Sequence, residues 1–142
     1  MPMLIGEYLL TFDERGHIQF PAEVRRGIDP EIDGNAFFVV MGRNHKLWIY
    51  PDRYYEKLAM KSAPPPASAD ASSGFESFEF AMACRVELDR VGRILLPKKL
   101  LHRQGLQRDV TLIGVRDHLE IWNRPEWAEY RAELMARVMP YP

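Results

Sequence analysis

The chain has 142 residues, and its content of 46% hydrophobic and 27% charged residues is that of a soluble globular protein. That composition excludes a disordered or fibrous chain, and no apolar run is long enough to cross a bilayer. The 19 lysines and arginines are balanced by 20 acidic residues, for a net charge of −1, so any nucleic-acid-binding surface must be one basic face of a neutral molecule.

The N-terminus and the single cysteine both fit an intracellular protein. Residues 1–7 lack the basic flank and the long apolar core of a secretion signal. Cys84 has no partner for an internal disulfide, and in a strand-like context it is most simply a small core residue. We therefore expect a cytoplasmic protein.

The first half of the chain alternates short strands with short helices. In chain order, the predicted elements are strands at 7–13 and 18–20, a helix at 22–26, strands at 36–40 and 47–50, and an amphipathic helix at 52–60. Pro21 ends a strand and starts a helix, because proline lacks the amide donor of a central strand but suits a first helical turn. Gly27 stands where a C-cap would end that helix.

Residues 61–74 are rich in proline, alanine and serine and carry almost nothing that could be buried. We expect this segment to be a mobile linker between two halves. Phe75, Phe78 and Phe80 follow it, and we expect them to form a short helix or turn that packs across the two halves.

The second half repeats the order of the first. Its predicted elements are strands at 83–89 and 94–96, a helix at 98–104 that Gly105 ends, strands at 109–113 and 119–122, and a helix at 125–138. In the first of these strands, Cys84, Val86 and Leu88 alternate with two charged residues. In the last helix, apolar residues recur at helical spacing and are expected to face the core: Trp127, Tyr130, Leu134 and Val138.

The two halves are copies of one unit. The segment 13–21 recurs as 89–97, which is 76 residues later, and 47–50 recurs as 119–122, which is 72 residues later. The halves thus differ by four residues, which we assign to one internal loop. We predict pseudo-two-fold symmetry, with a first repeat at 1–60, the linker at 61–74 and a second repeat at 75–142.

Each copy contains Asp-x-x-Gly followed five residues later by proline. An aspartate can accept hydrogen bonds from backbone amides ahead of it, and glycine can take the positive φ that such a loop requires. We therefore interpret six residues as structural turn residues rather than as catalytic ones: Asp13, Gly16 and Pro21 in the first copy, and Asp89, Gly92 and Pro97 in the second.

Two copies of this motif, each within a strand–loop–strand–helix–strand–strand unit, resemble the SpoVT/AbrB-type swapped-hairpin barrel. The tandem arrangement is similar to the MraZ family of bacterial transcriptional regulators, and the likeness covers nearly the whole chain. The opening at 6–8 and the segment at 127–130 also resemble that family.

The resemblance implies an α+β fold, with two tandem swapped-hairpin half-barrels that form a pseudo-dimeric β-barrel flanked by short helices. It further implies a ring-like homo-oligomer that binds double-stranded DNA at short direct repeats, in a promoter of division and cell-wall genes. The protein would be cytoplasmic and nucleoid-associated, without a cofactor, a small-molecule substrate or a membrane partner.

In that family the Asp-x-x-x-Arg loop carries the DNA contact, and here the first copy departs from the pattern. Arg93 keeps the arginine, whereas the first copy has His17. A guanidinium is always charged and can bind two acceptors at once, which a neutral imidazole cannot do. Arg15, in the same loop, is a candidate substitute. The predicted DNA-binding residues are Arg93, Arg90, Arg15, His17, Lys98 and Lys99.

Other functions have less support in the sequence. The four histidines have no zinc-ligand spacing, and we find no phosphate-binding glycine loop or catalytic triad, so we expect neither a metal site nor an enzyme. The near-neutral charge and His17 favour an alternative, an oligomeric barrel scaffold that binds a protein partner. A second alternative is an AbrB-like antitoxin, for which the short segment after the last predicted helix leaves little toxin-binding tail.

Overall fold

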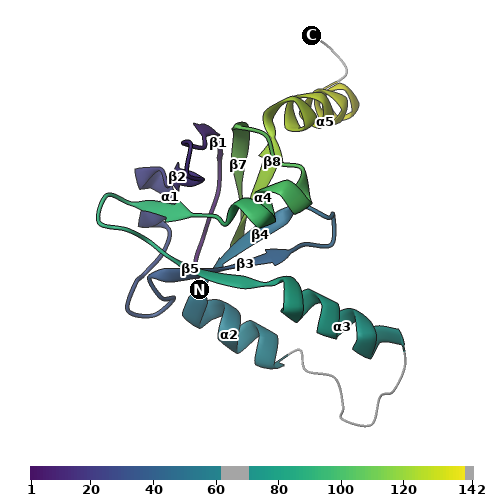
Figure 1. Cartoon of the computed structure of the whole chain (residues 1–142). Coiled ribbons are helices and arrows are strands. Elements are labelled where there is room, and N and C mark those ends of the chain that lie inside the picture. Colours follow the sequence, from purple (N-terminus) through teal and green to yellow (C-terminus); the bar gives the residue numbers. More distant parts are fainter. Residues whose placement is uncertain (62–70, 140–142) are drawn as a thin grey trace.

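The computed structural model describes residues 1–61 and 71–139 (Figure 1). The first half comprises β1 (Glu7–Thr11), β2 (His17–Gln19), α1 (Ala22–Arg26), β3 (Ala36–Met41), β4 (Leu47–Pro51) and α2 (Asp52–Lys61). The second half comprises α3 (Ala71–Met82), β5 (Cys84–Glu87), β6 (Arg93–Leu95), α4 (Lys98–Gln104), β7 (Asp109–Val115), β8 (His118–Asn123) and α5 (Arg124–Val138). These bounds lie close to the predicted ones, except that α3 includes residues 71–74 of the predicted linker. Residues 62–70 of that linker lie outside the described residues.

The strands form one antiparallel six-stranded sheet, in the order β1-β7-β8-β4-β3-β5, and a separate two-stranded ribbon of β2 and β6. Each half lends its first strand to the other half, because β1 pairs with β7 and β5 pairs with β3. The α+β class is confirmed. A closed barrel is not found in the described part of the chain, since the sheet ends at β1 on one side and β5 on the other.

The strand order is symmetric when the two halves are exchanged. Ile18 pairs with Ile94 in the ribbon, and Trp48 pairs with Glu120 in the sheet, so each of these residues faces its own counterpart. The pseudo-two-fold relation therefore passes through both pairs.

The four-residue difference between the halves is not in one loop, and that expectation is wrong. Phe37 pairs with Pro51 as Val110 pairs with Asn123, so the counterpart of Phe37 lies 73 residues later. Three residues of the difference precede β3, and the fourth lies in the β3–β4 turn.

The hydrophobic core lies between the inner face of the sheet and the ribbon with its flanking helices. Ile18 and Ile94 are fully buried at 1% and 0% exposure. Phe20, just after β2, packs edge-on against Phe37 of β3 with ring centroids 4.9 Å apart. One face of the ribbon thus packs against the sheet, and the other face is exposed to solvent.

Helices α2, α3 and α5 lie at the two ends of the sheet, as Figure 1 shows, with α2 and α3 at one end and α5 at the other. The expected burial of the α5 stripe is wrong, because α5 has no buried residue and Val138 is 77% exposed. Tyr130 stacks instead on Trp122, on the face of the sheet opposite the core, with centroids 5.3 Å apart. Helical periodicity identified the apolar side of α5 but not how much sheet lies beneath it.

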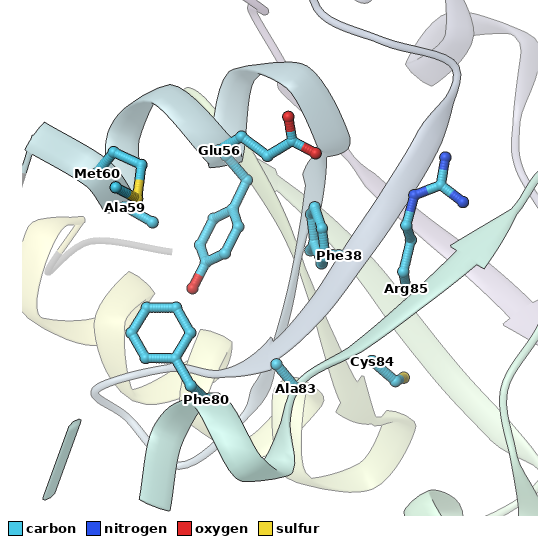
Figure 2. A pocket seen from close by; sticks show the side chains of 9 residues that line it. Phe38, Glu56, Ala59, Met60, Phe80, Ala83, Cys84 and Arg85 are labelled. Atoms are coloured by element: carbon cyan, nitrogen blue, oxygen red, sulfur yellow. The ribbon is translucent and has the colours of Figure 1, made fainter. Parts of the chain in front are cut away.

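The phenylalanines after the linker do lie on a helix, as predicted. Helix α3 contacts β3 of the first half, yet Phe75, Phe78 and Phe80 remain about half exposed or more. Between α2 and α3 an apolar groove of about 330 Å³ is lined by Phe38, Tyr55, Met60, Phe80 and neighbouring residues (Figure 2). Glu56 and Arg85 also line this groove.

Candidate nucleic-acid interface

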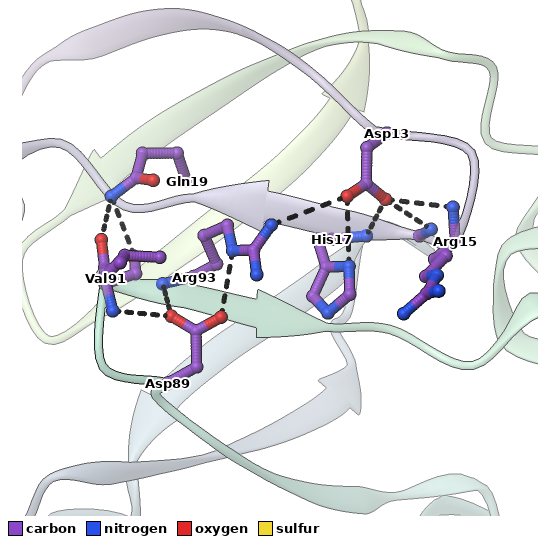
Figure 3. A network of polar contacts seen from close by, with 9 residues as sticks. Asp13, Arg15, His17, Gln19, Asp89, Val91 and Arg93 are labelled. Carbon is purple, nitrogen blue, oxygen red and sulfur yellow. Dashed lines mark hydrogen bonds and ion pairs between the residues drawn. The ribbon is translucent and has the colours of Figure 1, made fainter.

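The exposed face of the β2–β6 ribbon brings the two motif copies together (Figure 3). His17 pairs with Leu95 and Gln19 pairs with Arg93, and paired residues in an antiparallel ladder share one face. Because Ile18 and Ile94 point into the core, those four side chains point outward. The two loops, 13–17 and 89–93, lie at opposite ends of this face, as the positions of Arg15 and Val91 in Figure 3 show.

The first loop is closed by the carboxylate of Asp13. Its Oδ1 accepts hydrogen bonds from the backbone N–H groups of Arg15, Gly16 and His17 at 2.9, 3.0 and 2.8 Å. Its Oδ2 lies 3.0 Å from His17 Nδ1. Asp13 therefore holds the loop in shape, which is the turn-forming role predicted for it.

The second loop repeats this arrangement with arginine in place of histidine. Asp89 Oδ1 accepts hydrogen bonds from the N–H groups of Val91 and Arg93 at 3.0 and 2.9 Å. Arg93 Nε donates to Asp89 Oδ2 at 2.9 Å. Both carboxylates have a lowered pKa, chiefly because the backbone N–H of His17 donates to Asp13 and that of Arg93 donates to Asp89.

Each loop also binds the opposite half through its backbone. The N–H of Phe20 donates to the Gly92 carbonyl at 2.9 Å, and the N–H of Leu96 donates to the Gly16 carbonyl at 3.0 Å. Gly16 and Gly92 have φ of +100° and +85°, where side chains other than that of glycine are strained. The repeated glycines are therefore required by the backbone.

Arg93 lies on β6 rather than at the tip of its loop, and its side chain is 38% exposed. Besides its bond to Asp89, its Nη1 lies 3.7 Å from Asp13 Oδ2 of the other half. The guanidinium thus lies between two carboxylates, one from each motif. His17, whose side chain is 18% exposed, contacts only the first of these carboxylates in the described structure.

The remaining predicted DNA-binding residues are exposed but are not gathered at one point. Arg15 and Arg90 lie in the two loops, and Lys98 and Lys99 lie in the first turn of α4. Arg103, on the same helix as these lysines, donates to the Met82 carbonyl at 3.2 Å.

Arg25 belongs to this surface, and sequence reasoning missed it. A Cβ placed on Gly92 would lie 2.9 Å from Arg25 Nη1, so the guanidinium of α1 covers the second loop. Arg25 is exposed, and its side chain makes no hydrogen bond or ion pair with any residue in the described ranges. Its counterpart in α4 is Leu101, which covers Gly16 in the first loop. The contact joins two halves, so no local pattern could indicate it.

The two loops therefore differ in charge although they share a backbone. Residues 13–17 contain two acids and one arginine, for a formal charge of −1 with neutral His17. Residues 89–93 contain one acid and two arginines, for a charge of +1. Arg25 adds a further cation beside the second loop only.

A buried polar cluster lies on the opposite face of the sheet. His118 lies between Asp117 and Glu120, with N···O distances of 2.9 and 3.2 Å, and it stacks on Trp48 of the first half. Tyr54 of α2 donates to Asp117 at 2.6 Å. This cluster joins the two halves, because Trp48 and Tyr54 belong to the first and His118 and Asp117 to the second.

No group of three histidine, cysteine or acidic residues that could hold a metal ion occurs in residues 1–61 and 71–139. Over the same ranges, none of the helices has the length and apolarity that a bilayer crossing requires.

Comparison with known proteins gives one consistent result. Residues 3–77 and 80–138 match the family model described as "MraZ protein, putative antitoxin-like". The chain is 36% identical over 128 residues to the "Transcriptional regulator MraZ" of Clostridium beijerinckii, covering 90% of this chain and 87% of the relative. Identity to the protein of the same name is 36% over 128 residues in Desulfitobacterium hafniense strain Y51 (90% and 86% coverage). It is 33% over 129 residues in Symbiobacterium thermophilum (91% and 90% coverage).

Proposed function

The chain belongs to the MraZ family of transcriptional regulators, and we propose that it regulates transcription by binding double-stranded DNA in a sequence-specific manner through the exposed face of the β2–β6 ribbon. Its targets are short direct repeats in a promoter of division or cell-wall genes. It acts in the cytoplasm, at the nucleoid, as a ring-like homo-oligomer. We assign each half, 1–60 and 75–142, to one swapped-hairpin repeat, which the exchange of β1 and β5 between halves supports.

The ribbon is the observation that carries this proposal. The major groove of B-DNA admits a two-stranded antiparallel ribbon, and arginine reads guanine there through paired hydrogen bonds. The ribbon presents Arg93, whose guanidinium lies between the two motif carboxylates, and Arg25 beside the second loop, with Arg15 and Arg90 in the flanking loops. Lys98 and Lys99 supply phosphate contacts, which position a protein without reading sequence.

Oligomerisation compensates for the single cationic loop of each subunit. Exposed apolar side chains stand at both ends of the sheet, with Phe75 and Phe78 on α3 and Met135 and Val138 on α5. Two different surfaces that meet head to tail generate a ring when the rotation closes. Linkage of several loops raises avidity by about 10²–10⁴ without new contacts.

The direct test is binding of the protein to its own upstream region, with Arg93→Ala beside wild type. Loss of a bidentate base contact costs about 1–3 kcal/mol, or about 5- to 150-fold per site. Arg43→Ala, in the exposed β3–β4 turn, removes the same charge outside the ribbon and outside the proposed assembly surfaces, and it serves as the control. Equal binding by the two variants would contradict the proposed interface.

The oligomer is tested by varying repeat number and salt. We expect affinity to rise steeply from one repeat to several and to fall with added salt, because bound lysines and arginines release counterions. Equal affinity for one repeat and for several contradicts the avidity mechanism.

Arg15→Ala tests whether Arg15 substitutes for the missing arginine of the first motif, and unchanged DNA affinity in this variant would exclude that role.

A second candidate is a scaffold that binds a protein partner. The apolar groove between α2 and α3, and the exposed phenylalanines of α3, favour it. An antitoxin role is favoured only by the wording of the family description. Genes next to the coding sequence discriminate these functions, because division genes favour the regulator and a toxin gene favours the antitoxin.

A further inference from the structure

Four ionisable side chains with unequal partners meet on the exposed face of the ribbon. Asp13, Asp89 and Arg93 together carry a formal charge of −1, and His17 is the fourth member. In the second motif, Asp89 Oδ2 accepts the hydrogen bond of Arg93 Nε. In the first motif, the matching oxygen of Asp13 lies near two side chains, His17 Nδ1 at 3.0 Å and Arg93 Nη1 at 3.7 Å.

This sharing follows from the histidine. Imidazole is short, and in the described structure its only hydrogen-bond partner is Asp13, so no side chain of the first motif reaches Asp89. Arg93 is long enough to contact the carboxylates of both motifs at once. An arginine at position 17 would place a second permanent cation beside Asp13, which would compete with Arg93 for that carboxylate and repel it.

We propose that Asp13 of the first half is a positioning residue for Arg93 of the second half, and that the histidine at position 17 leaves Asp13 available for this role. The inference rests on the proposed DNA-binding function. Asp89 fixes the Nε side of the guanidinium, and Asp13 fixes the direction of its Nη1 end. Two restraints define the plane in which the guanidinium meets a base edge, whereas one restraint leaves it free to rotate.

Asp13→Asn isolates this role. The side-chain oxygen of asparagine can still accept the three backbone hydrogen bonds that close the loop. The NH2 group that replaces Oδ2 cannot accept a hydrogen bond from His17, and it carries no charge to attract Arg93. Glu14→Gln is the matched control, because Glu14 is exposed in the same loop and its replacement removes the same negative charge without touching Arg93. Equal melting temperatures for the two variants establish that the fold is retained.

A DNA-free measurement tests the contact itself. In wild-type protein we expect the Nη resonances of Arg93 to show slowed rotation about the Nε–Cζ bond by NMR. Asp13→Asn and His17→Arg should both restore fast rotation, and Glu14→Gln should not. Unchanged Arg93 signals in Asp13→Asn would overturn the positioning role, whether or not the protein binds DNA.

The DNA measurement compares affinity for the protein's own upstream duplex with affinity for a scrambled duplex of equal length. Removal of a negative charge should strengthen binding to both duplexes in both variants. Only Asp13→Asn should also lower the ratio of affinity for the upstream duplex to affinity for the scrambled duplex, by about threefold to tenfold, because the guanidinium of Arg93 is no longer held in one orientation. An equal ratio in the two variants contradicts the inference, whereas wild type that binds neither duplex contradicts the proposed function alone.

Discussion

The first and second loops have one backbone and two chemistries. In both, an aspartate accepts N–H groups ahead of it, a glycine takes positive φ, and the glycine carbonyl binds the opposite half. The charged side chains on this frame differ, with His17 in one loop and Arg93 in the other. The shape of each loop therefore depends on backbone contacts, which leave the recognition residue of each copy free to change.

The largest effect is expected where the halves are equivalent. Ile18→Ala and Ile94→Ala should each lower the free energy of unfolding by about 2–5 kcal/mol, because both side chains are fully buried and face each other across the pseudo-two-fold relation. Urea unfolding monitored by tryptophan fluorescence measures both. If the two losses of unfolding free energy differ by more than about 1.5 kcal/mol, the two isoleucines do not contribute equally to stability.

The glycines should reveal the first asymmetry. Ala at either position costs at least about 1 kcal/mol, because φ is positive at both. The new Cβ of Gly16→Ala would lie 2.7 Å from the Leu96 carbonyl oxygen, which is backbone, whereas that of Gly92→Ala would meet the movable ends of Arg25 and Gln19. We therefore expect Gly16→Ala to have the lower melting temperature. The reverse order would contradict this account of the two loops.

Patterns local to the chain predicted most of this frame. Asp13 and Gly16 act within a few residues of each other, so their loop could be read from spacing alone. The alternation of side chains in β1 does not indicate whether this strand pairs with β3 of its own half or with the equivalent β7 of the other half. In the structure it pairs with β7.

The same limit explains what was missed at the site. Arg25 reaches Gly92 only because α1 packs beside the loop of the other half, and the contact of Arg93 with Asp13 depends on the ribbon register. Arg103 follows Lys98 and Lys99 closely in the sequence, yet it binds the Met82 carbonyl. Charge along a sequence does not show which cations share a face.

A smaller effect, on DNA binding, is expected at Arg25, which lies beside the second loop only. Arg25→Ala should weaken binding to all duplexes by about threefold to tenfold and lower the slope of log affinity against log salt by about 1, as loss of one phosphate contact does. Arg26→Ala is the control, because Arg26 is exposed on the same helix and does not cover Gly92. Equal salt slopes for the two variants would remove Arg25 from the interface.

The smallest effect, on the pH dependence of stability, is expected at Glu120. This residue pairs with its counterpart Trp48 across the two halves, so the halves differ here as well. Burial raises the pKa of Glu120, but hydrogen bonds from His118, Trp122 and Asn44 outweigh it, so the net pKa lies below the ordinary 4.5. A carboxyl with a lowered folded-state pKa contributes stability above its unfolded value and loses it as pH falls through the folded one.

Wild type should therefore lose melting temperature more steeply than Glu120→Gln between about pH 5 and pH 3, and the difference should be small because the two influences on the pKa oppose each other. Glu129→Gln, on the exposed face of α5, should follow wild type over this range. Parallel curves for wild type and Glu120→Gln would mean that this carboxylate does not stabilise the junction of the halves.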